Sequence, residues 1–195
     1  MSNEQRLESA IRSLLKTKPR VIVAIDGMAA SGKTTLAASV AQRFPSCVVV
    51  HMDDFTVPFE DRYPGYFEKT LSNADVARFD REVLLPLADE QGALYRPYRC
   101  HPVPGFGEPI VIPADCTVVI VEGAYCLHPD LWDYYDLHAL MTISADTQRM
   151  RIRSRNGEAQ LERFLSAWIP MEHAHITARR LHERCDLILS EETAI

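Results

Sequence analysis

One stretch decides the fold: Gly27-Met28-Ala29-Ala30-Ser31-Gly32-Lys33-Thr34, which has the spacing G-x-x-x-x-G-K-T. It follows the apolar run at 21–25 directly, and with Thr35 it leads into residues 35–41, which favour a helix. Such a loop aims several backbone N–H groups at a phosphate that lies at the positive N-terminus of the helix. Lys33 can reach the β- and γ-phosphates, and the Thr34 hydroxyl can ligate Mg²⁺. The motif predicts that residues 27–35 bind ATP or GTP with Mg²⁺.

Strand and helix patterns alternate along the chain. Five largely apolar runs are expected to be strands, at 20–26, 47–52, 117–122, 138–144 and 186–190. An amphipathic helix ends before Pro19, and further helices are expected at 33–44, 73–89, 146–155 and 158–185, the last with a break at Pro170. Continuous apolar runs indicate strands that are buried on both faces. The pattern predicts an α/β fold, with a parallel sheet of about five strands flanked by helices.

Composition limits the class of protein. The 195 residues fit a single domain, and the formal net charge of −6 disfavours nonspecific binding to nucleic acid or to an anionic membrane. The five cysteines include no C-x-x-C pair, which is typical of free thiols in a reducing compartment. No apolar run approaches the length of a membrane span, and residues 1–18 lack the pattern of a targeting signal. We expect a cytoplasmic protein with no nucleic-acid or membrane partner.

Carboxylates follow two of the predicted strands, where a parallel sheet binds its ligands. Asp53 and Asp54 come after the second strand, and Asp53 is our candidate for the base that deprotonates a hydroxyl attacking the γ-phosphate. The alternative is an acidic pair that caps a helix or a turn. Glu122 ends the third strand and is a candidate Mg²⁺ ligand, held directly or through water.

Four arginines alternate over residues 148–156, at Arg149, Arg151, Arg153 and Arg155. On a helix, the pairs 149/153 and 151/155 fall on two neighbouring faces. One face could cover the phosphates and neutralise the charge of the transition state, while the other meets solvent. We expect a helical lid over about 146–172, in which Arg153 and Arg155 close over the phosphates.

Two long connections, at 56–71 and 95–114, depart from the regular alternation. Tyr66 lies in the first, and Tyr98, Arg99 and His101 lie in the second. Aromatic rings can stack on a flat ligand, and Arg or His can bond its oxygens. With Asp53, these four residues are our candidates for binding the acceptor, and surface decoration is the alternative.

With these residues in view, the chain resembles the uridine kinase-like branch of small-molecule P-loop kinases, a group that also contains pantothenate kinase and phosphoribulokinase. The likeness covers most of the chain and rests on D-G-x-x-x-S-G-K-T at 26–34, M-D-D-F at 52–55, F-D-R-E-V-L-L-P-L at 79–87, V-I-V-E-G at 119–123, the R-x-R-x-R-N start of the lid, and W-I-P-M-E at 168–172. It implies a P-loop NTPase fold with Asp53 as catalytic base. It also implies that the loop after Asp53 and the segment at 95–98 shape the acceptor pocket.

The departures from that family lie in the acceptor pocket. Thr56 stands where uridine kinases have an aromatic residue, and residues 98–101 match their nucleoside-contacting Y-D-F…H segment only loosely. The leading interpretation is a kinase that phosphorylates a hydroxyl of a small molecule, such as uridine or cytidine. A kinase for pantothenate or a phosphosugar stays open, with Arg62, Arg96 and Arg99 as counter-charges. A nucleotide-binding regulator without kinase activity and assembly into a homo-oligomer also stay open.

Overall fold

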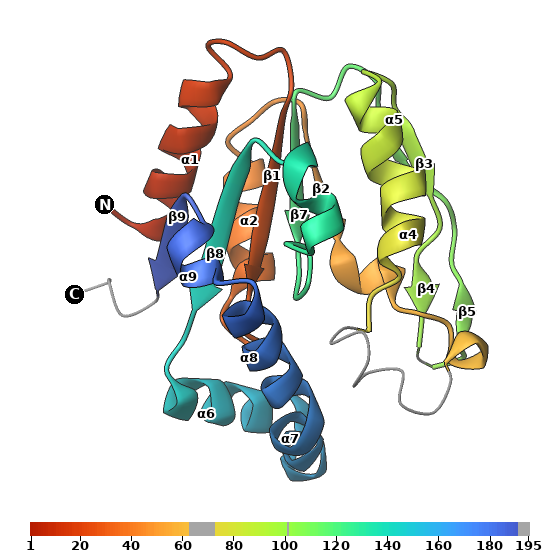
Figure 1. The fold of residues 1–195 in the computed structure, drawn as a ribbon, viewed down its shortest axis with the longest axis vertical. Coiled ribbons are helices and arrows are strands. Elements are labelled where there is room, and N and C mark those ends of the chain that lie inside the picture. Colours follow the sequence, from red (N-terminus) through yellow and green to blue (C-terminus); the bar gives the residue numbers. More distant parts are fainter. Residues whose placement is uncertain (63–72, 101, 191–195) are drawn as a thin grey trace.

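The computed structural model describes residues 1–62, 73–100 and 102–190. Its centre is a five-stranded parallel sheet with the order β2-β7-β1-β8-β9 (Figure 1). The strands are β1 (Val21–Gly27), β2 (Cys47–His51), β7 (Val118–Glu122), β8 (Leu137–Thr142) and β9 (Leu187–Ser190). Each lies within two residues of its predicted bounds, so the predicted α/β fold with about five parallel strands is confirmed.

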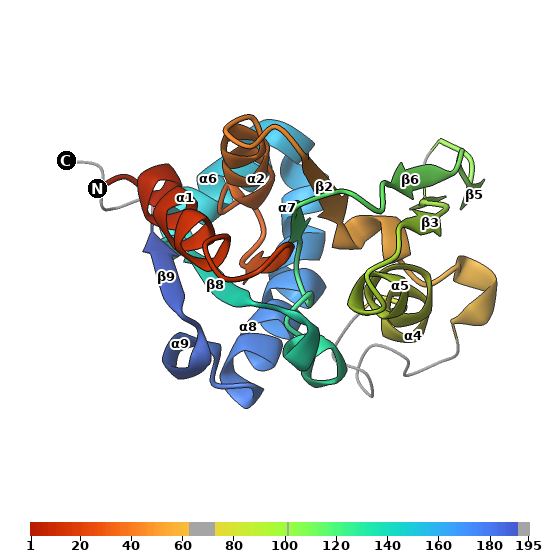
Figure 2. The same cartoon turned by 90° about the horizontal axis from the view of Figure 1, so that it is seen from above.

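Helices cover both faces of this sheet (Figure 2). They are α1 (Asn3–Leu14), α2 (Lys33–Ala41), α4 (Val76–Phe79), α5 (Leu85–Ala88), α6 (Ala145–Asn156), α7 (Glu158–Arg163), α8 (Ile169–Ala178) and α9 (Leu181–Arg184). Within the described ranges, none of the helices is long and apolar enough to cross a membrane. The five cysteines are free thiols, as predicted.

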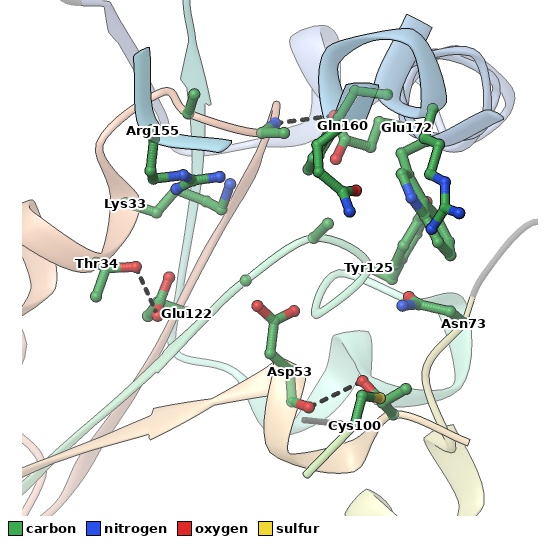
Figure 3. A pocket seen from close by; sticks show the side chains of 18 of the residues that line it. Lys33, Thr34, Asp53, Asn73, Cys100, Glu122, Tyr125, Arg155, Gln160 and Glu172 are labelled. Atoms are coloured by element: carbon green, nitrogen blue, oxygen red, sulfur yellow. Dashed lines mark hydrogen bonds between the residues drawn. The ribbon is translucent and has the colours of Figure 1, made fainter. Parts of the chain in front are cut away.

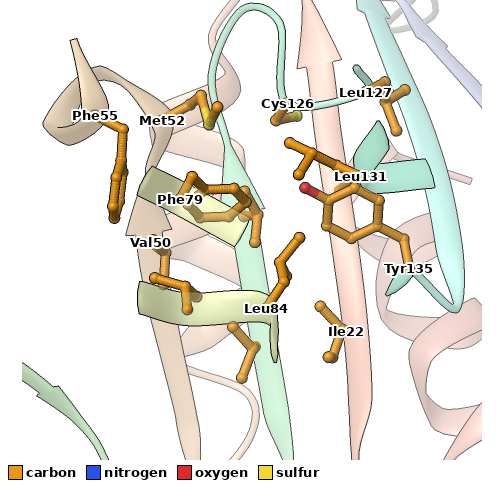
Figure 4. Packing of buried hydrophobic residues seen from close by; sticks show 14 of the residues in the cluster. Ile22, Val50, Met52, Phe55, Phe79, Leu84, Cys126, Leu127, Leu131 and Tyr135 are labelled. Atoms are coloured by element: carbon orange, nitrogen blue, oxygen red, sulfur yellow. The ribbon is translucent and has the colours of Figure 1, made fainter. Parts of the chain in front are cut away.

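The side chains of β1 alternate between two hydrophobic cores. Val23 and Ile25 pack against apolar side chains of the helices on one face, such as Leu7 of α1 and Leu36 of α2. Ile22 points to the opposite core, which is larger and contains aromatic side chains from the α4–α5 segment and its neighbours (Figure 4). Burial on both faces explains why this strand reads as a continuous apolar run rather than as an alternation.

Two prolines lie inside helical segments, each directly after a π-helical turn. The turn at Asp80–Leu84 joins α4 to α5 and precedes Pro86, and the turn at Phe164–Trp168 joins α7 to α8 and precedes Pro170. A proline lacks an N–H and clashes with the carbonyl four residues earlier, and in both cases that carbonyl lies in the wide turn. The predicted break at Pro170 is therefore wrong. The segment ends after Ala178, where Arg180 adopts a left-handed φ of 53°.

The proline-rich segment 95–114 is more regular than predicted. It contributes to two short antiparallel pairs, β3 (Ala93–Tyr95) with β6 (Ile110–Ile112) and β4 (Tyr98–Arg99) with β5 (Gly105–Phe106). Strands of two or three residues are too short to produce a recognisable alternation in the sequence. Our expectation of an irregular connection is corrected here.

Asp26 joins three parts of the fold beneath the phosphate loop. Its carboxylate is 1% exposed and accepts hydrogen bonds from the N–H groups of Gly27, Tyr125 and Leu127, at 2.6, 3.2 and 2.9 Å. It also lies 3.1 Å from Nε2 of His175 in α8. Burial alone would raise the pKa of Asp26, but the charge and hydrogen bond of His175, together with the backbone N–H groups, hold it below its usual value.

Replacing Asp26 by Ala is expected to lower the free energy of unfolding by about 3–5 kcal/mol, because the change leaves buried N–H groups and His175 without their acceptor. Since the folded-state pKa is lowered, this contribution is present at neutral pH and is lost as the pH falls through the folded-state value. Urea denaturation of the parent, Asp26→Ala and the milder Asp26→Asn measures both effects. An alanine variant as stable as the parent would contradict the assignment.

Candidate active site

The phosphate loop lies between β1 and α2, at the carboxyl end of the sheet (Figure 1). Gly27 opens it with a φ of 142°, and a Cβ at this position would lie 2.0 Å from the carbonyl oxygen of Met141. Only glycine fits so close to the neighbouring strand. Gly32 caps α2, and among the described side chains none accepts a hydrogen bond from the first turn of this helix. The N–H groups of that turn are therefore suited to bind an anion.

Lys33, Thr34 and Glu122 lie together below the loop (Figure 3). The ammonium of Lys33 donates to the carbonyl oxygens of Gly27 and Met28, at 2.8 and 2.9 Å. The hydroxyl of Thr34 donates to Oε1 of Glu122 at 3.1 Å, so the two predicted Mg²⁺ ligands are neighbours. Their hydroxyl and carboxylate oxygens are the ligand types that Mg²⁺ prefers.

His51 is a second partner of Glu122. Its Nδ1 lies 2.5 Å from Oε1 of Glu122, and this hydrogen bond is the main cause of the raised pKa of His51. Glu122 therefore connects the end of β7 both to the phosphate loop and to the end of β2.

Asp53 and Asp54 face different surroundings. The Asp53 carboxylate points into the cavity, and burial of the site together with the charge of Glu122 raises the pKa of Asp53 (Figure 3). Asp54 is 1% exposed, accepts a hydrogen bond from the Tyr95 hydroxyl at 3.1 Å and forms an ion pair with Arg99. Asp53 is thus available to a ligand, whereas Asp54 anchors the short strands beside the cavity.

A cavity of about 940 Å³ connects the phosphate loop with Asp53 and with the segments that carry Tyr98 and Arg99. This size suits a nucleotide together with a second small molecule. The sequence analysis did not identify several residues that line this cavity, among them Asn73, Tyr125, Gln160, Arg163, Phe164 and Glu172. The W-I-P-M-E segment at 168–172 was a signal for the last of these.

The arginines of α6 are divided between two faces as helical spacing predicts, but Arg153 and Arg155, which we expected together over the phosphates, lie on different faces. Arg151 and Arg155 line the cavity, and Arg151 donates to the carbonyl oxygen of Ala30 in the phosphate loop at 3.2 Å. Arg153 lies on the exposed face, where its guanidinium bonds the carboxylate of Glu158 at 2.7 and 3.1 Å. Residues four apart share a helix face, whereas a separation of two places them on different sides. Because Arg153 lies away from the cavity, Arg151 replaces it as our candidate for contact with the phosphates.

The proposed acceptor residues are only partly described. Tyr98 is buried beside the cavity, and its hydroxyl accepts from the N–H of Phe59 at 3.3 Å. Arg99 also lines the cavity, but its charge is already paired with Asp54. Tyr66 and His101 lie outside the described residues.

The other candidate counter-charges are held by the protein itself. Arg62 lines the cavity, donates from Nε and NH2 to the carbonyl oxygen of Val57 at 2.9 and 2.7 Å, and stacks on the Phe59 ring. Arg96 is exposed and donates to the carbonyl oxygen of Gly107 at 2.9 Å.

Comparison with known proteins agrees with this geometry. Nicotinamide riboside kinase 2 of Homo sapiens is 32% identical over 143 residues, which are 70% of this chain and 58% of that protein. Nicotinamide riboside kinase 2 of Mus musculus is 30% identical over 139 residues, which are 70% of this chain and 68% of that protein. Uridine kinase of Bacillus licheniformis is 24% identical over 89% of this chain and 87% of that protein. The match thus spans somewhat more than half of the human relative. No family model matches the sequence.

The fold has a counterpart among solved structures. A possible uridine kinase from Bacillus stearothermophilus matches with a TM-score of 0.69 at 21% identity, covering 94% of this chain and 99% of that one. The fold, the phosphate loop and the relatives together define the class as P-loop kinases. Within that class, the chain belongs to the uridine kinase-like family, which includes the nicotinamide riboside kinases.

Proposed function

We propose that this protein transfers the γ-phosphate of ATP to a hydroxyl group of a nucleoside. The observation that carries the proposal is the placement of Asp53 across a shared cavity from the phosphate loop. A carboxylate at this place serves an acceptor, since binding of the triphosphate alone does not require it. The named activities of the relatives support the same reaction class.

The donor half of the reaction rests on residues 27–35. Loop N–H groups and Lys33 would bind the phosphates, and Thr34 and Glu122 would hold Mg²⁺, which would neutralise part of the phosphate charge. Arg151 and Arg155 reach the same cavity from α6 and would stabilise the charge that develops as the phosphoryl group moves. The two contacts with the loop carbonyls use two of the three N–H donors of the Lys33 ammonium, and the third could donate to a phosphate oxygen.

Asp53 would orient the attacking hydroxyl and accept its proton. Burial and the nearby Glu122 raise the pKa of this carboxyl, which makes its carboxylate a stronger base. The acceptor oxygen attacks the γ-phosphorus, the bond to the β–γ bridging oxygen breaks, and ADP leaves. Positioning and charge neutralisation supply most of the rate in such transfers.

We expect the rate of phosphorylation to fall as the pH drops through the raised pKa of Asp53, because the base must be deprotonated. Above that value the rate should reach a plateau. Measuring kcat/KM for the acceptor between pH 4.5 and pH 8 at saturating Mg-ATP tests this expectation, with Tm recorded at each pH. A rate independent of pH over a range where the protein stays folded would contradict the role of Asp53.

The class of acceptor is tested by a turnover and thermal-shift screen with Mg-ATP, and with Mg-GTP in parallel. The panel contains nicotinamide riboside, uridine and cytidine, with pantothenate and a phosphosugar as the alternatives. We expect a nucleoside to raise Tm and to yield ADP and the nucleoside monophosphate in equal amounts. Turnover of only pantothenate or the phosphosugar would replace the proposed acceptor. Slow hydrolysis by water alone would favour a regulator.

A further inference from the structure

The α6–α8 arm, residues 145–178, holds the phosphate loop by its backbone. The side-chain amide of Gln148 in α6 donates to the carbonyl oxygen of Ala29 at 3.1 Å. The carboxylate of Glu172 in α8 accepts from the N–H of the same Ala29 at 2.8 Å (Figure 3). Gln148 is 2% exposed and Glu172 is 6% exposed. Both hydrogen-bonding groups of one loop residue are thus engaged by two buried side chains of the arm.

The part of the loop that is held in this way cannot be fixed by its own side chains. Ala29 and Ala30 end at Cβ, and Ala30 adopts a left-handed φ of 60°, which is costly for a residue other than glycine. Arg151 bonds the carbonyl oxygen of Ala30 at 3.2 Å, so a third contact comes from the same arm. A strained conformation persists only where its surroundings enforce it.

We propose that Gln148 and Glu172 are positioning residues for nucleotide binding: they fix the Ala29 peptide so that the phosphate loop is preorganised for a triphosphate. The arm and the loop then act as one unit, because displacement of α6 or α8 frees Ala29. This inference rests on ATP as the phosphate donor and is independent of the acceptor.

Glu172 adds a charge effect to this positioning. The pKa of Glu172 is raised to about 7, mainly by burial. The negative charges of Asp26 and Asp53 also raise it, whereas the hydrogen bond from the Ala29 N–H and the charge of Lys33 lower it. Tyr125, after β7, also faces this carboxyl. A triphosphate brings further negative charge, so its binding favours the protonated form of Glu172. The affinity for nucleotide should therefore fall as the pH rises through about 7, with uptake of a proton on binding.

The test measures the dissociation constant of Mg-ATP without acceptor, at pH 6 and pH 8, by calorimetry in two buffers of different ionisation enthalpy. Glu172→Ala and Gln148→Leu should each weaken binding about tenfold, since each leaves one buried group of Ala29 without its partner. Glu172→Gln keeps an acceptor for the Ala29 N–H and should bind within about threefold of the parent at pH 6. Its proton uptake should fall to the part contributed by the nucleotide itself.

Glu162→Gln is the matched control, because it removes the same charge from an exposed position on α7. It should keep the affinity and the proton uptake of the parent. In turnover assays, Gln148→Leu should raise KM for ATP about tenfold and change kcat by less than about threefold, as expected for lost positioning rather than lost chemistry.

Parent-like binding by Gln148→Leu and Glu172→Ala, or parent-like proton uptake by Glu172→Gln, would overturn the inference while leaving the proposed reaction intact. If Glu172→Ala does not fold, Gln148→Leu and Glu172→Gln decide the matter. Failure of the parent itself to bind Mg-ATP would instead overturn the nucleotide site on which both proposals stand.

Discussion

Replacing Asp53 by Asn is expected to lower kcat by about 10²–10⁴-fold, because the amide cannot accept the proton of the attacking hydroxyl. The dissociation constant for Mg-ATP should change little, since we assign Asp53 to the acceptor and not to the nucleotide. The Asp53 side chain is exposed at the cavity and Asn is close to it in size, so Tm should change little. Loss of activity without loss of stability is the expected signature of a residue that acts in the chemistry rather than in the fold.

Asp54→Asn is the matched comparison, because it makes the same chemical change at the next residue. Asp54 is buried and bonds Tyr95 and Arg99, so this variant should lose stability but retain kcat in its folded fraction. Steady-state kinetics, Mg-ATP binding and thermal melting of both variants decide between them. A folded Asp53→Asn protein that binds ATP and turns over at the parent rate would remove Asp53 from the mechanism.

Replacing Arg151 by Gln is expected to reduce kcat by about 10²–10³-fold, whereas Arg153→Gln should stay within about threefold of the parent. The two arginines are two residues apart in α6, and only Arg151 faces the cavity and the phosphate loop. Arg153 is exposed and bonds the exposed Glu158, so its loss removes no charge from the site. The comparison separates position from charge, because both variants lose one positive charge from the same helix.

Single-turnover rates at saturating Mg-ATP and acceptor measure this difference directly. The opposite order of effects, with Arg153→Gln slower than Arg151→Gln, would show that α6 binds substrates with its other face. Similar losses in both variants would point to a general contribution of the helix charge instead.

The central fold was predictable because its signals are local. The G-x-x-x-x-G-K-T stretch requires a strand before it and a helix after it, and the apolar run of β1 indicates a buried parallel strand. Asp53 and Glu122 could be proposed as site residues because the carboxyl ends of parallel strands meet at one edge of the sheet. Neither inference needs knowledge of long-range packing.

The choice of arginine face and the role of Glu172 depend on packing that the sequence does not encode locally. Helical spacing separates Arg151 from Arg153, but which face meets the loop is decided by how Gln148 and Ile152 are buried when α6 docks. Glu172 reaches Ala29 across 143 residues of chain, so only the folded arrangement reveals the contact. The short strands β4 and β5 likewise form through pairing that carries no periodic signal.

The most direct test of the proposed reaction follows the terminal phosphate of ATP in a single turnover. Parent protein is mixed with γ-labelled Mg-ATP and a nucleoside, either nicotinamide riboside or uridine, and the products are separated. We predict label in the nucleoside monophosphate at the rate at which ADP forms, and its absence when Asp53 is replaced by Asn. Label recovered only as inorganic phosphate, with every nucleoside unmodified, would contradict the proposal that this protein is a nucleoside kinase.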